Sequence, residues 1–160
     1  MQELYFAYGS NLAGRRMRER VPGARPRGRA RLEGFRLVAD KPGRDGSAKL
    51  NLVRAPDASV WGALWTLAAP DLCVLDRFEV GYERLAVRVR SGAGSLAATT
   101  YLSRMSCAGP ALARDYRALV LEGAREQGLP AAWIALLEAL PERQPRSAST
   151  GSRRAARSAG

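Results

Sequence analysis

The chain has 160 residues, of which 46% are hydrophobic, and carries a net charge of +11 from 26 basic and 15 acidic side chains. This length and hydrophobic content suffice for one compact domain with a buried core, without help from disulfides or metals. The chain contains no histidine, which excludes His-based catalytic triads, His-paired cysteine nucleophiles and most zinc sites, because each of these needs an imidazole.

The sequence also predicts the cellular compartment of the protein. No apolar run approaches the roughly 20 residues that cross a bilayer, and the start, MQELYFAYGSN, lacks the basic and apolar regions of a signal peptide. Cys73 and Cys107 have no CxxC spacing, so we expect reduced thiols that pack in the core. These features predict a cytoplasmic protein with no membrane partner and no metal.

The first predicted element is a short apolar strand that contains residues 4–7. Gly9 is expected to terminate it. This glycine can adopt a positive φ or allow another group to approach the backbone closely. Ser10 and Asn11 are good N-cap residues, and a short arginine-rich helix is predicted from Leu12 onward. Free N–H groups in its first turn would make the turn an anion-binding loop. The alternative is an ordinary strand-to-helix turn with a capping serine.

Strands dominate the next part of the chain. Alternating or continuous apolar residues predict strands at 30–40, 48–53 and 59–67. A helix of about two turns is predicted after Pro70, followed by a hairpin formed from residues 85–89 and 96–102. This order of elements favours a sheet or barrel with helices added.

The best candidate for chemistry lies in LDRFEVGYERL, residues 75–85. Glu79 follows an apolar helix and precedes Gly81, so its carboxylate is expected to face a pocket. Burial would raise its pKa, and such a group can act first as a general base and then as a general acid. Glu83 is instead expected to form an ion pair on the surface. The alternative for Glu79 is a solvated carboxylate at a helix end.

Two amphipathic helices are predicted in the last third, one between Pro110 and Gly128 and one between Pro130 and Pro141. Residues 142–160 hold five arginines against one glutamate and no aromatic or large aliphatic residue. Such a segment cannot bury enough apolar area to fold. We therefore predict one domain over residues 1–141 and a disordered basic tail over 142–160.

Positive charge is concentrated near the N-terminus, where nine arginines and two acids lie between Gly14 and Arg36. This run could contact phosphates, but it lacks interleaved aromatic residues and matches no nucleic-acid motif. Binding to nucleic acid is therefore expected to be weak at most, although a nucleic-acid-associated protein remains an alternative.

Five segments in this order resemble γ-glutamylcyclotransferase-like proteins: YFAYGSNL (5–12), VWGALWTL (60–67), LDRFEVGYERL (75–85), TTYL (99–102) and DYRALVLEGAREQGLP (115–130). The resemblance covers nearly all of residues 3–141. It implies an α+β fold, a small mixed β-barrel or sheet with flanking helices. It also implies a pocket in which the YGSN loop faces Glu79.

The activity implied by this resemblance is the conversion of a γ-glutamyl amide to 5-oxoproline and a free amine, without a metal or cofactor. Glu79 would be the general acid and base. The substrate-binding residues would come from the loop and from two later tyrosines: Tyr8, Gly9, Ser10, Asn11, Leu12, Tyr101 and Tyr116.

The sequence leaves the substrate open, whether a γ-glutamyl amino acid related to glutathione, a γ-glutamylamine or a larger intermediate. The polar loop 41–49 could favour an acidic leaving group or be an ordinary surface loop. A non-catalytic small-molecule-binding module that retains the pocket is the alternative function. The oligomeric state is also left open.

Overall fold

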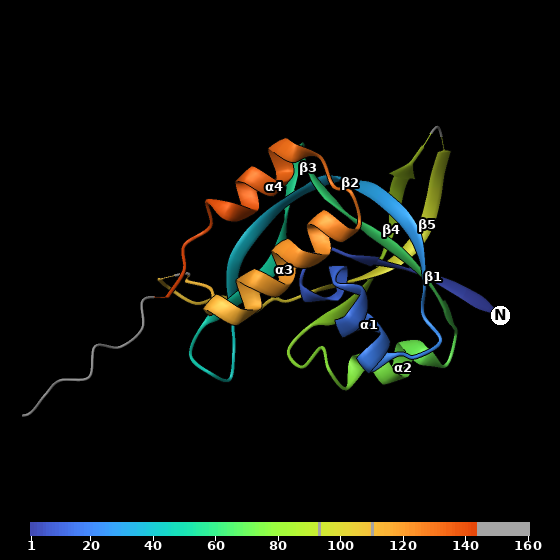
Figure 1. The fold of residues 1–160 in the computed structure, drawn as a ribbon, viewed down its shortest axis with the longest axis horizontal. Coiled ribbons are helices and arrows are strands. Elements are labelled where there is room, and N and C mark those ends of the chain that lie inside the picture. Colours follow the sequence, from blue (N-terminus) through green and yellow to red (C-terminus); the bar gives the residue numbers. More distant parts are fainter. Residues whose placement is uncertain (93, 110, 144–160) are drawn as a thin grey trace, which may run out of the picture.

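A five-stranded closed β-barrel with short helices on its outside forms the molecule (Figure 1). The computed structural model describes residues 1–92, 94–109 and 111–143. The strands are β1 (Gln2–Ala7), β2 (Arg25–Pro42), β3 (Ala48–Ala68), β4 (Glu83–Ser91) and β5 (Gly94–Leu102). The helices are η1 (Ser10–Leu12), α1 (Gly14–Arg20), α2 (Asp71–Asp76), α3 (Arg114–Glu126) and α4 (Ala131–Glu138). The predicted α+β barrel with flanking helices is confirmed.

The barrel closes in the order β1-β3-β2-β4-β5, and the first and last strands of the chain join its two edges. β1 pairs in parallel with β5 at Tyr5 and Thr99, whereas the other neighbouring strands are antiparallel. The barrel is therefore mixed. Both faces of its wall are packed: Phe6 and Leu64 lie opposite each other on one face, Trp65 lies on the other, and all three are fully buried.

The two strands predicted at 48–53 and 59–67 are one strand, β3, of 21 residues. Pro56 lies between the two predicted strands, and proline cannot donate to a sheet ladder. The pairing with β2 does lapse there: Arg54 lies opposite Phe35 and Ser59 opposite Glu33, so residues 55–58 bulge outward near Gly34. Gly34 has a positive φ of 80° at this irregularity. Because residues 55–58 have no partner in β2, the absence of an N–H group on Pro56 leaves no hydrogen bond of this ladder unmade, and the strand continues.

Neither Ser10 nor Asn11 caps a helix, which corrects a prediction from the sequence. The chain makes the 3₁₀ turn η1 and then α1, and no side-chain hydrogen bond caps either of them. The Asn11 side chain is instead committed to other polar groups in the interior, as described below. The physical reason is that its amide satisfies buried partners that a capping geometry would leave unpaired.

Helix α3 lies against η1 and holds it in place. Gly123 is buried, and a Cβ atom at this position would overlap the backbone of Leu12 and Ala13. Glu126 accepts a hydrogen bond from the Gly14 N–H at 2.9 Å, and Gln127 donates to the Leu12 carbonyl at 3.2 Å. The loop between β1 and α1 is therefore fixed by packing and by hydrogen bonds from one helix.

Two further predictions need correction. Cys73 is exposed on α2, where its sulfur lies 3.5 Å from an Arg84 nitrogen, and Cys107 is only half-buried, so neither thiol is a fully buried core group. Glu142 and Arg143, assigned to the tail, pack on the domain: Arg143 donates its N–H to the Leu112 carbonyl at 2.8 Å. We therefore propose that the domain extends to residue 143; the rest of the predicted tail, 144–160, lies outside the described residues. Within the described ranges, every helix is too short or too polar to cross a membrane.

Candidate active site

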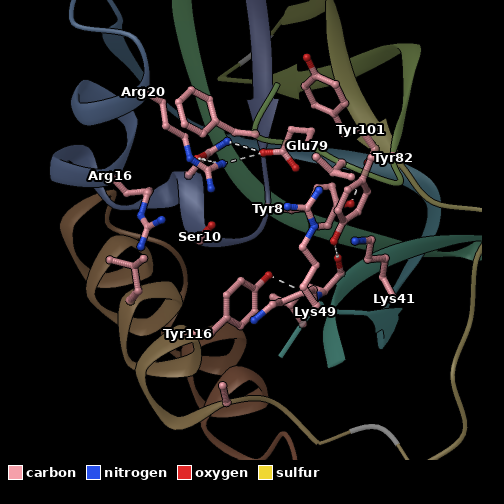
Figure 2. Close-up of a pocket in the computed structure, with 18 of the residues that line it drawn as sticks. Tyr8, Ser10, Arg16, Arg20, Lys41, Lys49, Glu79, Tyr82, Tyr101 and Tyr116 are labelled. Carbon is pink, nitrogen blue, oxygen red and sulfur yellow. Dashed lines mark hydrogen bonds and ion pairs between the residues drawn. The ribbon is translucent and has the colours of Figure 1, made fainter. Parts of the chain in front are cut away.

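A pocket of about 770 Å³ opens beside the loop that follows β1 (Figure 2). Its walls come from that loop and α1, from the ends of β2 and β3, from the segment after α2, and from the start of α3. Glu79 lies on one wall, and Tyr116 faces it from α3 across the pocket (Figure 2). The closed barrel and α3 thus bring together segments that are far apart in the sequence.

Glu79 is held by a pair of donors on one of its two oxygens. Its Oε1 accepts hydrogen bonds from Asn11 Nδ2 at 3.0 Å and from an Arg20 guanidinium nitrogen at 2.9 Å. The same Arg20 nitrogen donates to Asn11 Oδ1 at 3.0 Å, and Asn11 Nδ2 also donates to the Tyr5 hydroxyl at 2.9 Å. Glu79 Oε2 accepts no hydrogen bond from the residues that the structure describes. One oxygen is therefore anchored, and the other is available to a ligand.

The pKa of Glu79 is raised above its ordinary value, chiefly because burial disfavours the charged carboxylate. The Arg20 guanidinium and the hydrogen bonds from Asn11 and Arg20 act in the opposite direction. The Glu79 and Arg20 side chains are each 14% exposed. A carboxylate with a raised pKa takes up a proton more readily than an ordinary glutamate and can return it, as a general base and then a general acid must.

The loop after β1 contains backbone N–H groups without partners among the described residues: Tyr8, Ser10 and Asn11 of this loop line the pocket, whereas Gly9 does not. The N–H groups of Gly9, Ser10 and Asn11 donate no hydrogen bond within the described part of the chain. Gly9 has a φ of −116°, so the position does not require left-handed backbone. Its lack of a side chain matters through close approach, because a Cβ atom there would lie 3.1 Å from the Tyr116 hydroxyl.

Three tyrosines form a polar frame around the pocket. Tyr8 donates its hydroxyl to the Tyr101 carbonyl at 2.7 Å, and Tyr82 donates to the Leu50 carbonyl at 2.7 Å. The Tyr116 hydroxyl accepts the Leu50 N–H at 3.2 Å, which leaves its own proton free to donate to a ligand. Burial raises the pKa of all three phenols, so they are neutral donors and acceptors.

Two of the predicted substrate-binding residues have other surroundings. The Tyr101 ring lines the pocket, but its hydroxyl donates to Asp76 at 2.9 Å and is turned toward α2, away from Glu79 (Figure 2). Leu12 is fully buried in the core and does not line the pocket. Tyr8, Ser10, Asn11 and Tyr116 do line it, and Ser10 is half-buried.

Sequence reasoning named the loop 41–49, whose two ends, Lys41 and Lys49, line the pocket, but among other lining residues it missed Arg20 and Tyr82. Arg20 is one of nine arginines in its region, and nothing in the local pattern marks it as the partner of Glu79. Tyr82 follows Gly81, whose φ of 83° turns the chain after Glu79. A glycine two residues after a candidate carboxylate was the available signal for a turn that brings the next aromatic residue into the pocket.

Comparison of the sequence with known proteins identifies the family to which the chain belongs. Residues 5–124 match the family model described as "Gamma-glutamyl cyclotransferase, AIG2-like". The chain belongs to the γ-glutamylcyclotransferase family. It is 30% identical to human γ-glutamylcyclotransferase over 147 residues, which cover 86% of this chain and 78% of the human protein. It is 29% identical to the bovine γ-glutamylcyclotransferase over 136 residues, which cover 79% of this chain and 72% of the bovine one.

Solved structures show the same family fold. A structure titled "Gamma-glutamyl cyclotransferase" superposes with a TM-score of 0.84 at 27% identity and covers 92% of each chain. The structure of a human protein titled as uncharacterized superposes with a TM-score of 0.82 at 29% identity, over 91% of this chain and 92% of that one. The predicted membership of the γ-glutamylcyclotransferase family is confirmed.

Proposed function

We propose that this chain is a γ-glutamylcyclotransferase that converts a γ-glutamyl amide to 5-oxoproline and a free amine, with Glu79 as general base and then general acid. Family membership supports the type of activity. The single observation that carries the assignment of Glu79 is that one of its carboxylate oxygens is anchored by Asn11 and Arg20, while Oε2 has no partner among the described residues and the side chain lines the pocket.

The reaction needs no other reactant, and two protons pass from the attacking nitrogen to the departing one. Glu79 takes the first proton from the α-ammonium group of the substrate, and the freed amine attacks the γ-carbonyl carbon. A new C–N bond closes the five-membered lactam, Glu79 gives its proton to the departing nitrogen as the original amide C–N bond breaks, and the second proton, lost by the ring nitrogen, follows the same route, so the amine leaves as an ammonium ion. Because the attack is intramolecular, the substrate itself supplies much of the proximity. The protein has to position the substrate and carry the proton.

The remaining roles follow from the donors around the pocket. The unpartnered N–H groups of Gly9, Ser10 and Asn11 would bind the substrate α-carboxylate or the oxyanion that forms on the γ-carbonyl. The Tyr116 hydroxyl has a free proton within reach of the same loop and would donate to the same groups. The Tyr8 phenol forms part of the wall.

The proposal is tested by incubating the purified protein with γ-glutamyl amino acids and γ-glutamylamines and measuring 5-oxoproline. Release of 5-oxoproline together with an equal amount of free amine is the expected result. Binding of these compounds without any product would instead support the alternative function, a non-catalytic module that retains the pocket. Release of free glutamate in place of 5-oxoproline would show that water, and not the α-amine, attacks the amide.

A further inference from the structure

Two lysines face each other at the pocket end of the β2–β3 hairpin. Lys41 of β2 and Lys49 of β3 are direct partners across the antiparallel pair. Both line the pocket, on the wall made by this hairpin (Figure 2). Like charges directly opposite each other in a sheet are destabilising. A protein that retains such a pair on a pocket wall gains from a ligand that neutralises it.

The surroundings of the two lysines neutralise only one of them. Lys41 is 9% exposed, yet its ammonium has no hydrogen bond and no ion pair in the described part of the chain; it lies 5.0 Å from the centre of the Tyr82 ring. The Lys49 ammonium lies 4.6 Å from the centre of the Tyr116 ring, forms an ion pair with Asp45 at 3.4 Å and donates a hydrogen bond to Ser47 Oγ at 3.2 Å. Asp45 also accepts hydrogen bonds from both the N–H and the hydroxyl of Ser47.

Two more carboxylates line the pocket: Glu79, which attracts Lys41 electrostatically, and Asp115 at the start of α3. Glu79 is paired with Arg20, and exposed Arg44 of the same hairpin also lines the pocket. The backbone of Leu50 holds the two tyrosines against which the lysines lie, since it donates to Tyr116 and accepts from Tyr82. The lysines are thus positioned by a built frame, on a different wall from the loop proposed to hold the glutamyl group.

We propose that Lys41 and Lys49 form a subsite for the leaving amine, and that the preferred substrate is a γ-glutamyl amide whose amine portion carries two negative charges. This inference rests on the proposed function. Two ammonium groups on one wall match either two carboxylates, as in an acidic amino acid, or the dianion of a phosphorylated amine. Partial removal of the lysines from water strengthens their attraction to such a group.

Two matched pairs of substrates test this subsite and distinguish the two sources of charge. The first pair is γ-glutamyl-glutamate and γ-glutamyl-glutamine, which are nearly equal in shape. The second is the γ-glutamyl amide of O-phosphoethanolamine and that of ethanolamine. We expect kcat/KM to be about tenfold or more higher for the more anionic member of at least one pair. This preference should shrink as ionic strength rises, because salt screens the interaction.

Variants connect the preference to the two lysines. Lys41→Met and Lys49→Met should each lower kcat/KM for the more anionic member several times more than for its matched partner. Lys41→Arg keeps the positive charge and should therefore keep the preference. Arg27→Met is the control, because it removes one positive charge from an exposed part of β2 that does not line the pocket. It should leave the ratio within each pair unchanged.

Several results would overturn the subsite without affecting the proposed function. Equal kcat/KM values within both pairs would do so. An equal loss for all four compounds in the lysine variants would also do so, because it would place the lysines at the glutamyl group that all four share. If no compound releases 5-oxoproline, the proposed function fails, and calorimetric binding of the same four compounds then decides the subsite: equal affinities within both pairs reject it.

Discussion

Asn11 connects the loop after β1 to the carboxylate of Glu79. It is 3% exposed and uses both ends of its amide, donating to Tyr5 and Glu79 and accepting from Arg20. A buried glutamate is costly unless it is paired and hydrogen-bonded. Arg20 and Asn11 supply both kinds of partner on one oxygen, which allows the carboxylate to be retained in the pocket with its second oxygen unpaired.

Arg20 sets the pH range in which Glu79 can act as a base. The Arg20 guanidinium lowers the pKa of Glu79 against the effect of burial, so Arg20→Met should raise that pKa further. Since the carboxylate form is the base, activity is lost as pH falls through this pKa. The acidic limb of the kcat/KM profile should therefore move to higher pH in the variant.

The control for this prediction is Arg18→Met, which removes an exposed arginine from the same helix. Its acidic limb should coincide with that of the unchanged protein. If Arg20→Met lowers activity equally at every pH, Arg20 has a structural role or binds the substrate directly, and it does not tune Glu79.

At the scale of elements, α3 fixes the position of the loop that bears the proposed substrate donors. Gly123 allows the helix to contact the Leu12–Ala13 backbone, and Glu126 and Gln127 bond to the two ends of that segment. Arg15 adds an exposed ion pair to Glu122 of α3 at 2.8 Å. The loop geometry is thus determined by a helix that follows it by about a hundred residues.

Gly123→Ala should therefore damage both stability and substrate binding. The added methyl group overlaps backbone that cannot rotate away, and overpacking of this kind costs about 1–3 kcal/mol. We expect a lower free energy of unfolding in urea and a raised KM for a γ-glutamyl substrate. Gly23→Ala is the control, since the nearest atom to its Cβ would be at 3.9 Å and its φ is not positive. Equal stability of the two variants would contradict the packing account.

The sequence predicted the elements better than it predicted their partners. Alternating apolar residues located the strands, and prolines and glycines located the helices of the last third, because these signals are local. Pairing between Arg20 and Glu79, or between Lys41 and Lys49, depends on closure of the barrel and on the hairpin register. Local patterns carry no information on such contacts.

The predicted site shows the same division. Glu79 and the loop from Tyr8 to Asn11 were identified as candidates because a carboxylate after an apolar helix and a glycine turn after a strand are visible in the sequence. The direction of the Tyr101 hydroxyl, toward Asp76, was not. Which face of β5 a tyrosine occupies and what its hydroxyl reaches depend on the position of α2, which only the folded chain determines.

At the scale of the whole molecule, the domain ends later than the sequence indicated. Glu142 forms an ion pair with Arg117 at 3.1 Å, and the Arg143 guanidinium donates to the Asp45 carbonyl at 2.9 Å. Residues 142 and 143 therefore connect the C-terminal end of the domain to α3 and to the β2–β3 hairpin.

Two truncations test this boundary. Removal of residues 144–160 should leave turnover of a γ-glutamyl substrate unchanged, since the predicted basic tail is proposed to be dispensable. Removal of residues 142–160 should also lower the melting temperature by several degrees, because it deletes hydrogen bonds worth about 1 kcal/mol each. Equal melting temperatures for the two truncated proteins would place the boundary at Pro141. A loss of activity on removal of residues 144–160 alone would show that residues beyond 143 contribute to the site.

The most direct test of the account is the rate of 5-oxoproline release by Glu79→Gln compared with Glu83→Gln. Glutamine keeps the shape of Glu79 and can still accept from Asn11 and Arg20, but it cannot take up and return a proton, so kcat should fall by about 10²- to 10⁴-fold. Glu83, four residues after Glu79, is exposed and forms an ion pair with Arg104. Its replacement should leave the rate unchanged. A folded Glu79→Gln protein that forms 5-oxoproline as fast as Glu83→Gln would contradict the proposed role of Glu79.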